Sequence, residues 1–337
     1  MRVVIGVACL LVLVLEAAVV LRPSAEPVVR RRSTGEVFQD TLRTKKPEIV
    51  LVGNSLLLDS TDASIFTALS GRRTIIVGHG GSASAWWYLA LKNVILKAPR
   101  KPRLVVVFIR DRDLTDPGFR VTGEYQHDID EMATSHEPVL EELAYQGTMS
   151  TPTYLLYRHC SLYQQRLAIK QRLNARIRDK IVPVLTGRPG SADRAIQRMF
   201  RDQNLDPALL TMRQLAAESR QMSETGDFYG QLDRSFLPHM LRLAQDKGVR
   251  IAVVRMKRRR DTTPNRELPA LRTYVEDLES YLTQNQAPFI DLTQEAEITL
   301  DLYAAGDHLR ATPTVRRQFT RLLAKRLAPV LSTLPSP

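Results

Sequence analysis

The stretch IVLVGNSL, residues Ile49 to Leu56, places a continuous apolar run directly before a Gly-Asn-Ser turn. Two further apolar, β-branched runs follow at Arg73 to Gly78 and Leu104 to Ile109. Each run is continuous enough to form a strand buried on both faces. The segments between them, Thr61 to Leu69 and Ala83 to Leu96, have helical spacing. Strand, helix, strand, helix, strand predicts a parallel sheet with right-handed crossovers.

The same alternation returns near the end of the chain. We expect strands at Val249 to Arg255 and Pro288 to Leu292, and helices at Phe236 to Lys247, Leu268 to Asn285 and Val315 to Leu331. Residues 48–113 and 234–337 are therefore predicted to form one α/β domain with five parallel strands. Residues 114–233 are too long for a structureless loop and are mostly helical by period, so we expect an inserted helical cap.

The composition excludes several classes of protein. With 337 residues, of which 44% are hydrophobic and 25% charged, the chain is neither a disulfide-stabilised miniature nor wholly disordered. Its net charge of +12 favours anionic partners. Residues 158–201 carry nine Arg and two Lys against two Asp, which is +9 of that excess. The basic stretches lack interleaved aromatic residues and any groove-binding pattern, so no nucleic-acid partner is expected.

Part of this basic stretch has the period of an amphipathic helix. Apolar residues recur at three-, four- or seven-residue steps between Leu162 and Ile181, and Arg and Lys fill much of the remainder. Such a helix either lies against an anionic membrane or a membrane partner, or packs on the sheet with a solvated basic face.

Residues 1–22 contain an apolar run, Val3 to Leu21, that is interrupted only by Glu16. Its length is about the ~20 residues that a transmembrane helix needs. We expect a transmembrane signal anchor; a signal peptide and a buried core helix are the alternatives. Arg22 and the residues 30–32 follow the run, and the positive-inside rule would hold these arginines in the cytoplasm. Residues 23–47 are polar and rich in charge and proline, which predicts a tether.

Two polar segments from opposite ends of the chain are predicted to meet at one edge of the sheet. Ser55 follows the first strand, and Gly306-Asp307-His308-Leu309 follows the last one. Ligands of open α/β sheets bind at the carboxyl ends of the strands, so His308 could act as general base for Ser55. Each residue has an alternative interpretation: Ser55 as a helix cap, and His308 as a surface or capping residue.

A glycine block, Gly78-His79-Gly80-Gly81-Ser82, follows the second strand. Its glycines could let backbone N–H groups approach a substrate oxygen as oxyanion donors. The block also matches the dinucleotide pattern G-x-G-x-x-A, although after the second strand and not the first. Trp86-Trp87-Tyr88, behind the block, are either core residues or a glycan platform. His127 to Glu131 has no second histidine at zinc spacing, so we expect no metal site.

In this order, the three blocks resemble those of the SGNH (GDSL-like) hydrolase superfamily. The resemblance covers Glu48 to Leu331 apart from the insertion, and the overall layout is similar to envelope proteins that accompany membrane-bound O-acyltransferases. It implies a flavodoxin-like three-layer sandwich and ester chemistry. Ser55 would be the nucleophile, His308 the base, and the amides of Ser55 and of Gly80 or Gly81 the oxyanion donors.

The chain departs from the family pattern after the first and third strands. Asn54 stands where Gly-Asp-Ser-Leu has its aspartate, and it can still hydrogen-bond locally. The third strand leads into Arg110-Asp111-Arg112-Asp113, where the family has Gly-x-Asn-Asp. Either Arg110 replaces the missing asparagine as a cationic donor, or Asp111 and Arg112 form a structural ion pair.

The acid of the triad is the third departure. The family places it three residues before the histidine, where this chain has Ala305. Asp307, adjacent to His308, is the candidate, and it would need a tight turn at Gly306 to reach the imidazole. Asp301 or a backbone carbonyl is the alternative partner.

These observations predict a membrane-tethered serine esterase or O-acyltransferase that acts on acyl, chiefly acetyl, esters of envelope polysaccharide and needs no cofactor. We expect it at the cell membrane, with a single N-terminal span, a globular domain outside the cytoplasm and a membrane-bound O-acyltransferase as candidate partner. The alternative is a catalytically silent module of the same fold that binds glycan or docks on a membrane acyltransferase.

Overall fold

A computed structural model of the chain describes residues 32–122, 125–134, 136–146, 150–160, 163, 227–262, 267–304 and 306–335. The described residues of 32–147 and 218–337 form one compact unit, which we call the α/β unit. Helix α8 (Thr151–His159) lies in a second unit, and the two are described separately. The predicted transmembrane segment 1–22 and the basic helix between Leu162 and Ile181 fall outside the described residues, apart from Tyr163.

The sheet of the α/β unit consists of five parallel strands in the order β2-β1-β3-β4-β5. They are β1 (Ile49–Gly53), β2 (Thr74–Gly78), β3 (Leu104–Ile109), β4 (Arg250–Arg255) and β5 (Phe289–Asp291). All five predicted strands are confirmed. The order is that of a flavodoxin-like fold, in which the direction of winding changes between β1 and β3.

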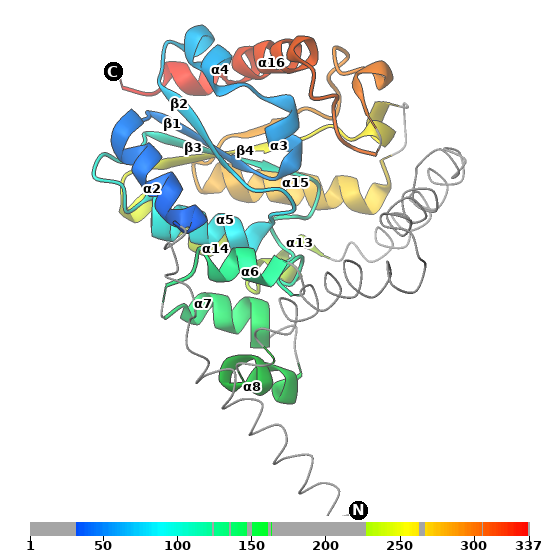
Figure 1. The fold of residues 1–337 in the computed structure, drawn as a ribbon. Coiled ribbons are helices and arrows are strands. Elements are labelled where there is room, and N and C mark those ends of the chain that lie inside the picture. The colour runs from blue at the N-terminus through cyan, green and yellow to red at the C-terminus, as the bar shows by residue number, and fades with distance from the viewer. Residues whose placement is uncertain are drawn as a thin grey trace, which may run out of the picture. The chain divides into compact units, whose positions relative to one another are not determined.

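Helices cover both faces of this sheet and complete the predicted three layers (Figure 1). On one face lie α3 (Ser55–Ser60), α4 (Ala63–Ser70) and α16 (Pro313–Ser332). On the other lie α2 (Thr34–Lys45), α5 (Ser84–Leu89), α14 (Leu237–Asp246) and α15 (Pro269–Gln284). Alternate strand residues such as Ile49 and Leu51 join the core beneath α16, while Val50 and Val52 are equally buried. Strands buried on both faces explain why the sequence runs are apolar without alternation.

Two helical segments differ in detail from the sequence prediction. The segment after β1 forms two helices, because Asn54 caps α3 and Asp62 caps α4 through bonds to the amides of Ser64 and Ile65. The helix expected from Ala83 to Leu96 continues beyond α5 as a π-helical turn over Ala90–Ile95. Residue 55 is therefore the first residue of a helix, a position that apolar periodicity alone does not indicate.

The prediction of a tether over residues 23–47 is wrong for its second half. Residues Thr34–Lys45 form α2, which begins with a capping box in which Ser33 and Glu36 satisfy each other's backbone N–H groups. Leu42 is 1% exposed, and Gln39 donates to the carbonyl of Asn93 at 3.0 Å. The helix carries few apolar residues, so it has no clear apolar periodicity. The capping box at Ser33 and Glu36 is the feature of the sequence that indicates its start.

The predicted boundaries of the insertion also need correction. The described residues of 114–147 belong to the α/β unit and include α6 (Tyr125–Asp130), α7 (Pro138–Leu140) and a π-helical turn at Glu141–Gln146. They are packed by buried apolar side chains, including Leu114, Val121, Ile129, Met132 and Leu140. Helix α13 (Phe228–Leu232) belongs to the same unit. Among the described residues, no helix is long and apolar enough to cross a membrane.

The end of β1 has no room for a side chain at residue 53. A Cβ on Gly53 would lie 3.0 Å from Cβ of Leu57 and 3.1 Å from Cβ of Phe108. We therefore expect Gly53→Ala to destabilise the fold by about 1–3 kcal/mol through overpacking. Gly80→Ala is the matched control, because a Cβ there meets nothing within 4 Å. Thermal unfolding of the two variants should separate them, and equal melting temperatures would contradict this account of β1.

Candidate active site

Ser55 lies at the switch point of the sheet, directly after β1 and at the start of α3. The helix cap is Asn54, whose Oδ1 accepts the backbone N–H of Leu56 at 3.0 Å and whose side chain is buried. The capping role considered for Ser55 therefore belongs to its neighbour. Within the described part of the chain the Ser55 hydroxyl makes no hydrogen bond, and the residue is partly exposed.

His308 is hydrogen-bonded to a carboxylate that the sequence analysis missed. Its Nδ1 lies 2.8 Å from Oδ2 of Asp59 in α3, four residues after Ser55. A carboxylate only accepts, so this bond places the imidazole proton on Nδ1 and leaves Nε2 able to take another. Residues four apart share one face of a helix, so Asp59 draws His308 toward the face that carries Ser55.

The loop that carries His308 is fastened to α3. A bridge pairs Tyr303 with Leu309, and the amide of Ala304 donates to the carbonyl of His308 at 2.8 Å. Arg316, in the first turns of α16, donates to the backbone carbonyls of Leu58 and Asp59 at 3.1 and 3.0 Å. No hydrogen bond joins Ser55 to His308 in the described residues. Catalytic hydrogen bonds are often long without substrate, so the arrangement remains compatible with a dyad.

Asp307 is not the partner of His308, and the prediction that it acts as the triad acid is wrong. Its Oδ1 accepts the backbone N–H of Arg259 at 3.2 Å, and its Oδ2 lies 3.9 Å from a guanidinium nitrogen of Arg110. Gly306 adopts a positive φ of 69°, and the adjacent side chains of Asp307 and His308 diverge to different partners. Asp301 does not contact the imidazole either, as Asp59 occupies its Nδ1.

The glycine block is tied to the end of β1. The carbonyl of Gly53 accepts both the amide of His79, at 3.3 Å, and the hydroxyl of Ser82, at 3.2 Å. Gly81 has a positive φ of 77°, and a Cβ on it would lie 2.7 Å from the ring of Tyr125 in α6. Gly80 is exposed. The block is therefore hydrogen-bonded to Gly53, which stands two positions before Ser55 in the sequence.

The aromatic run behind the block belongs to the core. Trp86, Trp87 and Tyr88 are each 2% exposed or less, and Trp87 donates its indole N–H to Ser82 at 3.0 Å. They support the glycine block from behind and are not a glycan platform.

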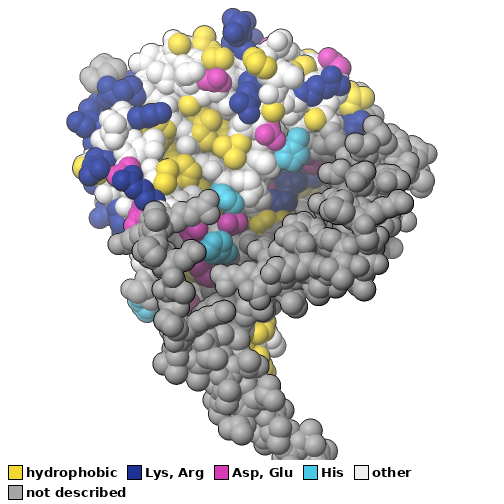
Figure 2. Space-filling view, in the orientation of Figure 1, with side chains coloured by type: hydrophobic (Ala, Val, Ile, Leu, Met, Phe, Trp, Pro, Cys, Tyr) yellow, Lys and Arg dark blue, Asp and Glu magenta, His cyan; other side chains and the backbone are white. Residues whose placement is uncertain are grey.

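Histidine, acidic and basic side chains gather over α3, α5 and α6 on the face shown in Figure 2. No group of three or more His, Cys, Asp or Glu in the described ranges could hold a metal ion.

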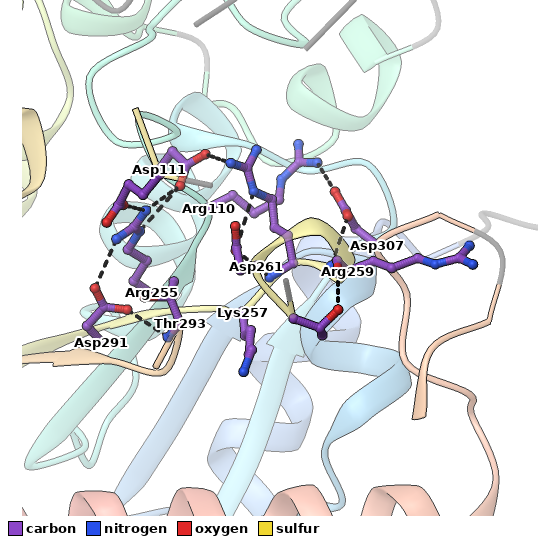
Figure 3. A network of polar contacts seen from close by, with 12 residues as sticks. Arg110, Asp111, Arg255, Lys257, Arg259, Asp261, Asp291, Thr293 and Asp307 are labelled. Carbon is purple, nitrogen blue, oxygen red and sulfur yellow. Dashed lines mark hydrogen bonds and ion pairs between the residues drawn. The ribbon is translucent and has the colours of Figure 1, made fainter. Parts of the chain in front are cut away.

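A network of ion pairs fills the sheet edge beyond β3 and β4 (Figure 3). Its centre is Arg255, the last residue of β4, whose side chain is 1% exposed. Its guanidinium contacts Asp111 at 3.0 Å, Glu267 at 2.5 Å and Asp291 at 2.9 Å. Arg258 also contacts Asp111, at 2.5 Å. This cluster had no signal in the sequence, where Arg255 ends an otherwise apolar strand.

The network includes the acidic residue that follows β3. Asp111 contacts Arg255 and Arg258, and Arg112 lies 3.7 Å from Asp116. Arg110 lies beside the switch point, 3.6 Å from Asp113 and 3.9 Å from Asp307. Its buried Nε has no hydrogen-bond partner.

Comparisons with known proteins give a match of structure and none of sequence. No protein-family profile matches the sequence, and no curated protein matches it. The structure is similar to the crystal structure of a GDSL-like lipase from Bacteroides thetaiotaomicron, with 11% sequence identity and a TM-score of 0.38. The match covers 86% of this chain and 89% of that one.

Removing the cation at the centre of the network should be costly. Arg255→Leu leaves three carboxylates without their shared partner, and we expect a loss of about 3–5 kcal/mol in the free energy of unfolding. Arg43→Leu is the comparison, because Arg43 pairs with Asp40 at the surface, and such pairs contribute at most about 1 kcal/mol. Denaturant unfolding measures both, and similar losses in the two variants would argue against a central role for Arg255.

The network also predicts a pH dependence of stability. Burial raises the pKa of Asp261 to about 6, despite the nearby charges of Arg258 and Arg255. The folded state thus holds this proton more tightly than the unfolded state, so the contribution of Asp261 to stability is full below about pH 4 and is lost as the pH rises through about 6. The change amounts to up to about 3 kcal/mol.

Asp261→Asn removes this titration. Between pH 4 and pH 7, the free energy of unfolding of the wild type should fall relative to that of the variant as the pH rises. A difference that stays constant over this range would show that Asp261 titrates normally.

Proposed function

We propose that this chain is a serine-dependent esterase or O-acyltransferase of the SGNH-like type, with Ser55 as nucleophile, His308 as general base and Asp59 as the residue that orients the imidazole. The observation that carries the proposal is the 2.8 Å bond between His308 Nδ1 and Asp59, one helical turn from Ser55 at the switch point of the sheet. A carboxylate on Nδ1 is the arrangement that fixes a histidine as base for a serine hydroxyl.

The reaction follows from this geometry. The oxygen of Ser55 attacks the carbonyl carbon of an acyl ester while Nε2 of His308 takes the hydroxyl proton. The imidazolium, stabilised by Asp59, then gives that proton to the departing alcohol, and an acyl-serine remains. Water completes hydrolysis, or a sugar hydroxyl completes transfer, by the reverse sequence of proton movements.

Stabilisation of the developing oxyanion is assigned to groups around the end of β1. The amides of Ser55 and of Gly80 or Gly81 are the proposed donors, in keeping with the attachment of the glycine block to Gly53. Arg110 takes the place of the missing asparagine as a cationic donor. Its side chain is 25% exposed, which supports this role, while Asp113 and Asp307 lie 3.6 and 3.9 Å from its guanidinium.

The proposed substrate is an acetylated polysaccharide of the cell envelope. The resemblance of the motifs to SGNH hydrolases, the apolar residues 3–21 and the basic stretch 158–201 support a membrane-tethered protein with a membrane-bound O-acyltransferase as partner. The chemistry needs neither a metal nor an organic cofactor, because the proton and the acyl group pass between side chains and substrate.

A catalytically silent module is the second candidate. It is favoured by the absence of a hydrogen bond between Ser55 and His308 in the described residues and by the pairing of Asp111, which follows β3, with Arg255 and Arg258. Such a module would keep the fold and bind glycan or an acyltransferase without turning over an ester.

Labelling with a fluorophosphonate probe separates the two candidates, because only an activated serine reacts. We expect the full-length wild type in detergent to label, Ser55→Ala and His308→Ala to be silent, and Asp59→Asn to label roughly 10³-fold more slowly, since an amide favours the wrong imidazole tautomer. Asp307→Asn is the matched control and should lose far less.

The thermal stability of each variant shows whether loss of labelling reflects loss of the fold. A folded wild type that does not label would support the silent module. If Asp307→Asn were the slow variant and Asp59→Asn normal, the assignment of Asp59 would be wrong.

A further inference from the structure

Arg120 has an unusual backbone for its residue type. Its φ is 58°, in the left-handed region that side chains other than glycine rarely adopt. A loop position in this region is normally occupied by glycine, asparagine or aspartate. Arginine at such a position carries backbone strain, as Lys46 and Gln286 do elsewhere in the described chain, so the functional argument rests on the contacts of the side chain.

The guanidinium of Arg120 is held against two aromatic rings. Its carbon lies 4.9 Å from the ring centroid of Phe119 and 5.4 Å from that of Tyr125. Both distances are within the range of cation–π contacts, which leave the N–H groups at the rim of the guanidinium available to a further acceptor. The residue is only partly exposed, so the charge is presented from a fixed place.

No hydrogen bond or ion pair engages the Arg120 guanidinium among the residues that the structure describes. The arginines at the sheet edge differ in this respect, since Arg110, Arg255 and Arg258 each have carboxylates within 4 Å. Asp113 is influenced by the charge of Arg120, which lowers its pKa against the stronger effect of burial, but Asp113 is paired with Arg110. Arg120 is thus a positioned cation with no direct ion pair in the described part of the chain, and the nearest charge that acts on it belongs to a carboxylate already paired with Arg110.

Its location connects it to the candidate active site. The Tyr125 ring beneath the guanidinium lies against Gly81, where an added Cβ would approach to 2.7 Å. The turn that contains Gly81 is bonded to the carbonyl of Gly53, two residues before Ser55. Arg120 is therefore connected to the turn of the proposed oxyanion donors through the ring of Tyr125.

We propose that Arg120 is a specificity-determining residue that binds an anionic group of the substrate, a carboxylate or a phosphate on the acylated glycan. The inference rests on the proposed function for the identity of the site. A guanidinium recognises either anion through paired hydrogen bonds. An acidic sugar bound there would be held next to the glycine block, with its ester directed to Ser55, and a neutral glycan would lack this anchor.

Calorimetric binding to the full chain in detergent tests the proposal without requiring turnover. The probes are oligogalacturonate, a phosphorylated oligomannose and a neutral oligogalactose of similar length. We expect the wild type to bind at least one of the anionic probes ten or more times more tightly than the neutral one, and the preferred probe identifies the anion. Arg120→Gln should remove this preference.

Arg321→Gln is the matched control, because Arg321 is an exposed arginine of α16 and its loss changes the net charge equally. It should retain the preference. Arg120→Gly gives a second readout: relief of the left-handed strain should keep the melting temperature at or above that of wild type while the preference is lost. A structural arginine would instead lower the melting temperature on replacement.

Three results would overturn the proposal: equal binding of all probes by wild type, retention of the preference in Arg120→Gln, or its loss in Arg321→Gln. Failure of fluorophosphonate labelling is a separate outcome. If the wild type does not label but prefers an anionic probe through Arg120, the esterase assignment fails and the anionic subsite stands.

Discussion

Close packing at the end of β1 is the constraint on which the remaining structure depends. Gly53 lies between Leu57 of α3 and Phe108 of β3 with no space for a Cβ. Because the backbone is so near to both, α3 begins immediately after the strand, and Asn54 and Ser55 emerge at the switch point. The carbonyl of Gly53 also anchors the glycine block through His79 and Ser82. One glycine thus fixes the position of the nucleophile candidate relative to its proposed oxyanion donors.

The sheet edge is divided into two electrostatically different parts. Beyond β4, Arg255 gathers three carboxylates, and burial there favours the protonated form of Asp261. Over α3, the pair of His308 and Asp59 is 41% and 34% exposed and lies outside this network. Asp307 joins the ionic part through Arg259 and Arg110. This division suits the proposed role of His308 as a base. Asp59 alone orients its imidazole, and the charge of Arg255 is neutralised by other carboxylates.

Sequence patterns predicted what depends on local periodicity and strand order, and missed what depends on caps and tertiary contacts. The five strands were recoverable because strands buried on both faces are continuously apolar. Helix α2 was missed because it has little apolar periodicity, although the spacing of Ser33 and Glu36 is a capping box that could have indicated it. Asp59 was missed for a related reason: with no helix expected at Ser55, its position one turn later had no meaning. Arg255 carried no signal, since its three partners are 144, 12 and 36 residues away.

In the proposed site, the carboxylate that orients His308 is Asp59 on α3, the helix that begins at Ser55, and not a residue of the histidine's own loop. The geometry of the site therefore depends on how this loop packs against α3. Ser55 and Asp59 move together with α3, so the position of His308 depends on how its loop docks on that helix. Arg316 fastens the start of α16 to the end of α3 through the carbonyls of Leu58 and Asp59. In the proposed mechanism, substrate binding completes a dyad whose orienting bond is already in place, and an anion anchored beside the glycine block would supply binding energy for that step.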